Sequence, residues 1–184
     1  TDVHPVFEAI MDSSLSLSGA SMGLVTRFDG ERLHIVTTRG LDANTPALAS
    51  FPMAPDRNSV SGRAVLDRMT INTPDIRREA GYFESGRASV EEHGIGSALG
   101  VPMMHNGACV GVFGLLRPET GTWPERVISV METFAAQAVI AIENVRLFRE
   151  TEVALERQTA MSDVLQVISE SPTNIQPVFD AIAE

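Results

Sequence analysis

The chain has little of several residue types on which enzymes and secreted proteins often depend. Its 184 residues include one cysteine (Cys109), one tryptophan and one tyrosine. A single cysteine excludes a disulfide within the chain and fits a reducing compartment. Basic residues are also few, with 14 against 24 acidic ones and a formal net charge of −10. Nucleic acids and anionic membranes bind basic surfaces, so we expect neither as a primary partner.

Long apolar runs are absent as well. None approaches the roughly 20 residues with which a helix crosses a bilayer, and the N-terminus lacks the basic-then-apolar pattern of a signal peptide. We therefore expect a cytoplasmic protein without membrane insertion. The histidines lie far apart without metal-ligand spacing, and there is no Walker-type glycine loop or nucleophile elbow. The sequence predicts no metal site and no catalytic triad.

A segment at the start of the chain returns near its end. Residues 1–10 and 173–182 are identical at six positions and conservatively changed at the other four. The offset of 172 residues exceeds solenoid periods of roughly 20–50 residues and suits one domain plus a linker. The sequence thus predicts a domain over 1–150, a helical coiled-coil-like linker over 151–172, and the truncated start of a second copy over 173–184.

Hydropathy periodicity divides the domain into helices and hairpins. Helices are expected over 2–18 and 59–67, and antiparallel hairpins over 22–38 and 97–116. Asp29-Gly30 and Asn106-Gly107 are favoured tight turns, because these residues tolerate positive φ. An irregular, proline-containing crossing, a short strand near 69–72 and a polar loop with one helical segment connect the two hairpins. The strands of the second hairpin are apolar on both faces, which predicts a central place in a covered sheet.

A helical pattern without internal glycine or proline then begins at about residue 125 and runs to about residue 170. At about 1.5 Å per residue, such a helix is roughly 68 Å long. Its first half has a broad apolar face, and beyond Ile142 the apolar stripe narrows. Because a helix outside its own domain cannot bury such a stripe alone, we expect a homodimer through this helix. A parallel pairing is the simplest, and an antiparallel one is the alternative. The expected interface and signalling positions are Ala138, Ala141, Val145, Phe148, Leu155, Leu165 and Ile168.

Several stretches together resemble the GAF domain of bacterial multi-domain sensor kinases and nucleotide cyclases. The resemblance covers about residues 1–150 and rests on residues 26–30, 59–64, 73–76, 99–103 and 133–144 (TRFDG, SVSGRA, TPDI, LGVPM and TFAAQAVIAIEN). It implies an α+β, PAS-related fold with a central antiparallel sheet of five or six strands. Terminal helices would cover one face, a small-molecule cavity would lie on the other, and a long C-terminal helix would leave the domain.

The same resemblance implies a non-catalytic sensory or regulatory module, with neighbouring GAF and output domains in the same protein. The sequence does not identify the small molecule. Two other functions stay open: a constitutive dimerisation scaffold with a collapsed cavity, and an enzyme like the methionine-sulfoxide reductases. The second needs an attacking thiolate and usually a resolving thiol, and Cys109 has no such partner.

The implied cavity suggests its own residues, each with a simpler structural alternative. Aromatic side chains are typical of pocket walls and of any core. Arg63 suits an anion or a surface ion pair, and the family places the position of Asp75 toward the cavity, although it can equally cap the next segment. The candidates are Phe51, Ser59, Arg63, Asp75, Tyr82, Phe83 and Phe113.

No cofactor is expected. Bilin-binding relatives attach their chromophore through a cysteine on the helix before the fourth strand, where this chain has Glu91-Glu92-His93. A covalent bilin is therefore not predicted. Haem on His93 is not predicted either, because an isolated surface histidine is usually solvated.

Overall fold

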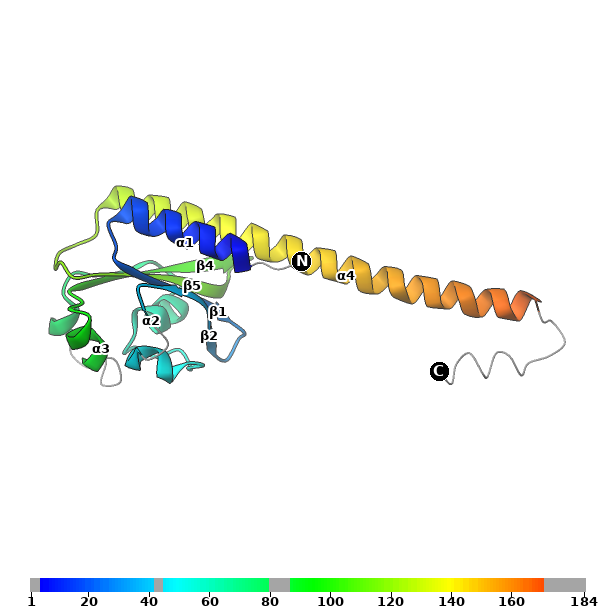
Figure 1. Cartoon of the computed structure of the whole chain (residues 1–184), viewed down its shortest axis with the longest axis horizontal. Helices are drawn as coiled ribbons and strands as arrows, with labels where there is room; N and C mark the ends of the chain where they lie inside the picture. The colour runs from blue at the N-terminus through cyan, green and yellow to red at the C-terminus, as the bar shows by residue number, and fades with distance from the viewer. Residues whose placement is uncertain (1–3, 42–44, 80–86, 171–184) are drawn as a thin grey trace. The chain divides into compact units, whose positions relative to one another are not determined.

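A computed structural model describes residues 4–41, 45–79 and 87–170 of the chain. It consists of two units, Thr1–Ile142 and Glu143–Glu184, and the long helix α4 (Glu125–Glu170) runs through both (Figure 1). The predicted second copy over 173–184 lies outside the described residues.

The first unit is built around a five-stranded antiparallel sheet with the strand order β2-β1-β5-β4-β3. The strands are β1 (Met22–Phe28), β2 (Leu33–Arg39), β3 (Ile71–Thr73), β4 (Ser97–His105) and β5 (Ala108–Arg117). β5 is central and is buried over residues 111–115, as the apolar second hairpin predicts. The expected α+β class with a five-stranded sheet is confirmed.

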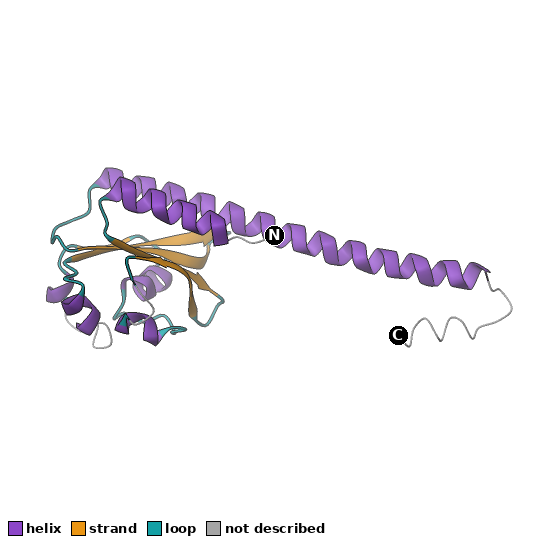
Figure 2. Ribbon diagram, in the orientation of Figure 1, coloured by secondary structure: helices purple, strands orange, loops and turns teal. Residues whose placement is uncertain are grey.

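Two helices cover one face of this sheet (Figure 2). They are α1 (His4–Ser18) and the part of α4 up to Ile142. Between them and the sheet lies the main core, in which Met11, Phe113, Trp123 and Met131 are all at most 1% exposed. The terminal helices therefore lie on the same face, as expected.

The short helices lie on the opposite face (Figure 2). They are η1 (Pro46–Ser50), α2 (Val60–Asp67), η2 (Ile76–Arg78) and α3 (Arg87–Glu92). α2 approaches the sheet closely at Gly100, where a Cβ atom would collide with Val60. A glycine within a strand is typical of such close approaches.

The two hairpin turns differ. Asn106 and Gly107 have φ of +48° and +79° and form the predicted two-residue turn. The other hairpin has a four-residue loop, 29–32, because Phe28 pairs with Leu33. The carboxylate of Asp29 organises that loop by accepting hydrogen bonds from the backbone N–H groups of Glu31 (2.9 Å) and Arg32 (2.8 Å).

This carboxylate makes the hairpin sensitive to acid. The backbone N–H groups of Arg32 and Glu31, followed by the side chain of His34, hold the pKa of Asp29 well below its usual range. A group whose pKa is lowered on folding stabilises the fold above its unfolded pKa, about 3.9 for aspartate, and this contribution is lost as the pH falls below that value. We expect Asp29→Asn to destabilise the protein at neutral pH, with a difference that shrinks below pH about 4. Urea unfolding of both proteins across this range measures it. A pH-independent difference would contradict the prediction.

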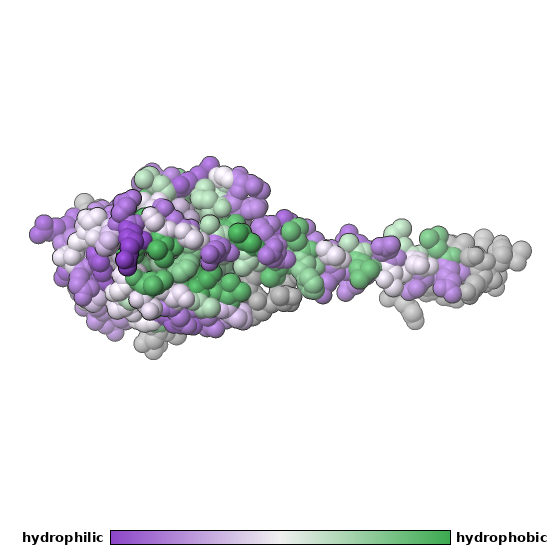
Figure 3. Space-filling model, turned by 90° about the horizontal axis from the view of Figure 1, so that it is seen from above, coloured by the Kyte–Doolittle hydropathy of each residue, from purple (hydrophilic) through white to green (hydrophobic). Residues whose placement is uncertain are grey.

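The described part of the second unit is helical. Hydrophobic residues appear at intervals among hydrophilic ones along α4 (green among purple in Figure 3). Of the expected interface positions, Phe148, Leu155 and Leu165 are 51%, 62% and 63% exposed. Val145 is half-buried, and the side chain of Ile168 lies outside the described ones.

Two of the expected interface positions belong to the first unit. Ala141 is half-buried there. Ala138 is 0% exposed because it packs in the core between α4 and the sheet. An alanine enclosed by its own domain cannot contact a second chain, so its assignment to the dimer interface is wrong.

Within the described ranges, one helix, Glu125–Gln166, meets the length and composition of a membrane span. Core helices of soluble proteins meet the same criteria. Met131 and Ala135 of this helix are buried in the core of the first unit, which is the behaviour of a core helix.

Candidate functional site

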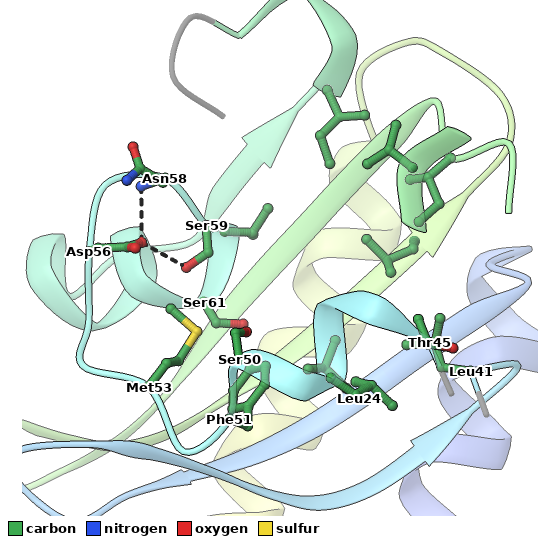
Figure 4. Close-up of a pocket in the computed structure, with 16 residues that line it drawn as sticks. Leu24, Leu41, Thr45, Ser50, Phe51, Met53, Asp56, Asn58, Ser59 and Ser61 are labelled. Atoms are coloured by element: carbon green, nitrogen blue, oxygen red, sulfur yellow. Dashed lines mark hydrogen bonds between the residues drawn. The ribbon is translucent and has the colours of Figure 1, made fainter. Parts of the chain in front are cut away.

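A cavity of about 80 Å³ lies on the α2 face of the sheet (Figure 4). Two of its walls come from the sheet, through Leu24 of β1 and Leu116 of β5. The crossing segment 45–61 forms most of the others. The apolar lining residues are Leu24, Leu41, Leu48, Phe51, Met53, Val60, Ile76, Val90, Ile95 and Leu116. The polar ones are Thr45, Ser50, Asp56, Asn58, Ser59 and Ser61.

The crossing segment is tied to the sheet beside the cavity. Leu33 and Met53 exchange both backbone hydrogen bonds, at 2.8 and 3.1 Å, and the guanidinium of Arg32 donates to the carbonyl of Pro52 (3.0 Å). These bonds place Phe51 and Met53 in the cavity wall. Phe51 therefore lies where the sequence analysis expected it.

The polar end of the cavity is the turn that leads into α2. Oδ1 of Asp56 accepts hydrogen bonds from the backbone N–H of Asn58 (3.0 Å) and from the hydroxyl of Ser59 (3.2 Å), both drawn in Figure 4. The Ser59 hydroxyl in turn accepts from the N–H of Gly62 (2.9 Å), which is the predicted N-cap. Ser59 thus caps the helix and lines the cavity.

Gly62 allows this turn to pack against the first turn of α2. A Cβ atom at Gly62 would collide with the backbone of Asp56. The loop and the helix therefore form one compact unit that holds the carboxylate at the cavity.

Two of the predicted polar residues lie elsewhere. Arg63 donates to the backbone carbonyl of Arg57 (2.8 Å) and to the carboxylate of Glu79 (2.9 Å). Asp75 caps η2 by accepting from the N–H of Arg77 (3.1 Å) and lies 3.2 Å from the guanidinium of Arg78. Neither lines the cavity, and for both the simpler alternative describes the structure.

Phe113 also lies elsewhere. Its ring is 6.4 Å from that of Phe7 of α1, in the core on the other face of the sheet. Side chains alternate between the two faces of a strand, and composition alone did not assign Phe113 to a face. The other two aromatic candidates, Tyr82 and Phe83, lie outside the described residues.

Most of the apolar lining and one charged group, Asp56, were not predicted from the sequence. The sequence did contain a signal for Asp56, because an aspartate followed by Asn58 and Ser59 favours an Asx turn leading into a capped helix. The apolar residues carried no such signal, because they come from separate elements, such as Leu24 of β1 and Val90 of α3.

Cys109 does not line the cavity. Its thiol donates to the carbonyl of Gly111 (3.1 Å), and burial raises its pKa, which lowers the fraction of nucleophilic thiolate. No group of three or more metal-ligating side chains occurs among the described residues. The described lining of the cavity combines apolar walls with hydroxyl groups, one amide and one carboxylate.

Comparisons with known proteins agree with this arrangement. A family model described as GAF domain matches residues 1–143. No curated protein sequence matches the chain. Among solved structures, the GAF domain of a phosphoenolpyruvate-protein phosphotransferase from Coxiella burnetii is similar, with a TM-score of 0.70 and 15% identity over 81% of this chain and 87% of that one.

Two further structures show the range of proteins with this fold. The GAF-B domain of DevS from Mycobacterium smegmatis has a TM-score of 0.61 and 22% identity, covering 82% of this chain and 99% of that one. A type II free methionine-R-sulfoxide reductase from Thermoplasma acidophilum has a TM-score of 0.60 and 11% identity, covering 78% and 96%. At these identities the likeness shows the fold alone.

Proposed function

The chain belongs to the GAF domain family, and from that premise we propose that it is a non-catalytic sensor that binds a small molecule in the cavity of the α2 face. GAF domains are generally sensory or regulatory modules of signalling proteins. In this proposal the bound molecule changes the helical layer across the sheet, and α4 carries the change to neighbouring domains. No cofactor or metal is needed.

The observation that carries the proposal is that single strands contact both the cavity and the helical core. In β5, Leu116 lines the cavity and Leu115 lies in the core with α1 and α4. In β1, Leu24 lines the cavity and Val25 lies in the same helical core. Because protein interiors are close-packed, a ligand that moves Leu24 or Leu116 also displaces the neighbours that support the helices.

The C-terminal end of β5 supplies a second connection to α4. Arg117 follows Leu116, and its guanidinium donates to the backbone carbonyl of Gly121 (2.9 Å) and lies 4.3 Å from the ring centre of Trp123. Trp123 stands just before the start of α4. A shift of β5 would therefore reach the first turn of this helix through Arg117.

Such signalling requires that the ligand bind one of two helix arrangements more tightly than the other. Allosteric coupling energies of about 1–3 kcal/mol, or 5- to 150-fold in affinity, are typical. The population shift, and not a chemical step, is the proposed output of the domain.

Native mass spectrometry of the freshly purified protein tests the binding function. We expect a bound small molecule as extra mass, and we expect Leu48→Trp to remove it, because Leu48 lines the cavity and an indole would fill it. Leu66→Trp is the matched control, since Leu66 is on α2 but 48% exposed and outside the lining. Equal occupancy in both variants would contradict a ligand in this cavity.

One observation favours a scaffold instead. At about 80 Å³ the cavity is smaller than pockets for drug-sized ligands, which are about 300–1,000 Å³. A bare dimer whose stability and oligomeric state are the same in Leu48→Trp would support a constitutive dimerisation role. The reductase alternative has no such support, because Cys109 is not among the residues that line the cavity and the chain has no second cysteine.

We further propose that the protein is a homodimer through parallel α4 helices, with 151–172 as the linker and 173–184 as the start of a second domain. The exposed apolar residues of α4, including Phe148, Leu155 and Leu165, support it, because burial of apolar area drives association. In a Cys109→Ser background, Leu155→Cys and Leu165→Cys should each crosslink to the same position of a second chain. Arg157→Cys, about 200° around the helix from Leu155, is the control. Absence of like-with-like crosslinks would exclude the parallel dimer.

A further inference from the structure

The lining of the cavity also restricts the charge of its ligand. We propose that the site takes a small apolar ammonium compound, with the hydrocarbon part against the leucine, isoleucine and valine walls and the ammonium group at Asp56. This inference rests on the proposed binding function of the same cavity. Its basis is the distribution of charged groups around the cavity.

The first step is that none of the described side chains that line the cavity is a cation. The chain has no lysine, and all 14 basic residues are arginines. None of the lining residues that the structure describes is an arginine. Residues 42–44 and 80–86 contain none in their sequence, and the side chain of Arg87 lies outside the described ones. Nearby arginines are already paired, Arg57 with Asp67 (2.8 Å) and Arg63 with Glu79 (2.9 Å). A phosphate or carboxylate buried without a cation would pay a large desolvation penalty.

The second step concerns the N-terminus of α2, which also reaches the cavity. A free helix N-terminus favours anions. Here the hydroxyl of Ser59 already accepts the N–H of Gly62 (2.9 Å), and the Asp56 carboxylate stands beside it, bonded to that same hydroxyl (3.2 Å). An incoming anion would therefore meet a negative charge at this end of the cavity.

The third step is the state of the Asp56 carboxylate itself. Only Oδ1 takes part in its hydrogen bonds, with the N–H of Asn58 and the hydroxyl of Ser59, both uncharged donors. Within the described ranges, Oδ2 has no hydrogen-bond or ion-pair partner, although the side chain is half-buried. Figure 4 shows the carboxyl end of Asp56 turned toward Ser59 at the cavity wall. A charged N–H donor forms roughly twice as strong a hydrogen bond to a carboxylate as a neutral donor.

The remaining lining fits the rest of such a molecule. Phe51 contributes an aromatic ring, whose face attracts cations, and Met53 contributes a polarizable thioether. Other apolar walls are Ile76, Val90, Ile95 and Leu116. A volume of about 80 Å³ suits a short alkyl chain better than an aromatic ring, since benzene occupies an engineered cavity of about 150 Å³.

The test compares n-butylammonium, 1-butanol and butyrate, which share an unbranched four-carbon chain and differ in charge. Each is titrated into the purified chain while amide resonances of residues 45–61 are followed by heteronuclear NMR. We expect n-butylammonium to bind most tightly and butyrate not to bind. Asp56→Asn, which keeps an Oδ1 acceptor for Asn58 and Ser59, should weaken n-butylammonium about tenfold and leave 1-butanol nearly unchanged.

Glu119→Gln is the control for the general negative charge, because Glu119 is exposed and outside the lining, and it should leave all three affinities unchanged. If 1-butanol or butyrate binds as tightly as n-butylammonium in the unmodified chain, the ammonium inference is overturned and the cavity remains a binding site. If none of the probes shifts these resonances, the ammonium inference is overturned, whereas the binding function is decided by the native mass spectrometry of the purified protein. The three probes are compared on the unmodified chain, so this comparison tests the ammonium inference even if Asp56→Asn does not fold.

Discussion

Replacing Phe113 by alanine should lower the free energy of unfolding by about 3–5 kcal/mol, the usual cost of removing a buried aromatic ring. Phe113 is 1% exposed and packs against Phe7 in the core below α1 and α4. Phe51→Ala is the matched comparison, because Phe51 is half-buried in the cavity wall. It should cost only about 1–2 kcal/mol.

Urea unfolding followed by circular dichroism measures both variants, and equal m-values show that stability alone has changed. The two variants should also differ in the probe titration. Phe51→Ala alters binding in the cavity, whereas Phe113→Ala leaves it nearly intact below the unfolding temperature. A larger stability loss in Phe51→Ala than in Phe113→Ala would contradict the fuller burial of Phe113.

Replacing Trp123 by alanine should have a similar effect, about 3–5 kcal/mol. The side chain is 1% exposed and packs beneath the guanidinium of Arg117 at 4.3 Å. Its backbone N–H donates to the side chain of Asn72 (3.2 Å), so that β3 and the segment before α4 are joined here. Loss of the ring leaves a cavity at the start of the helix that we propose carries the signal.

Trp123→Phe separates the ring's packing from its polar group. Among the described residues, the indole Nε1–H is buried without a hydrogen-bond partner, and an unpaired buried donor costs about 1–3 kcal/mol. Phenylalanine removes this donor and keeps most of the apolar contact, so we expect a loss below about 1.5 kcal/mol. Denaturant unfolding followed by circular dichroism compares the two variants, since tryptophan fluorescence is lost in both. A loss in Trp123→Phe as large as in Trp123→Ala would show that Nε1–H has a partner.

The elements of this fold follow from local sequence. The two-residue turn at Asn106-Gly107 needs positive φ at both positions, which asparagine and glycine accept readily. The hydroxyl of Ser59 accepts a hydrogen bond from the N–H three residues later, so residues close together in the sequence determine where α2 begins. The strands of the second hairpin are apolar on both faces, which likewise predicts a central position in the sheet. Each of these features depends on the chemistry of residues only a few positions apart.

The loop at Asp29-Gly30 shows where this local reasoning stops. The same dipeptide preference predicted a tight turn, but the carboxylate of Asp29 binds the N–H groups of both Glu31 and Arg32 and stabilises a longer loop. Arg63 and Asp75 show the same limit for the site. Their charge made them candidates for a ligand, and the structure gives them partners on their own face, such as Glu79 for Arg63.

By itself, then, the sequence determined the order of helices and strands, the family and the helical character of the C-terminal segment. Only the tertiary structure decided which side of each strand faces the cavity. It placed Phe113 and Ala138 in the helical core, and it brought Leu24, Val60 and Leu116 to one cavity beside Asp56. The physical reason is that turns and caps are stabilised by near neighbours in the chain, whereas a cavity exists only where side chains distant in sequence pack around the same space.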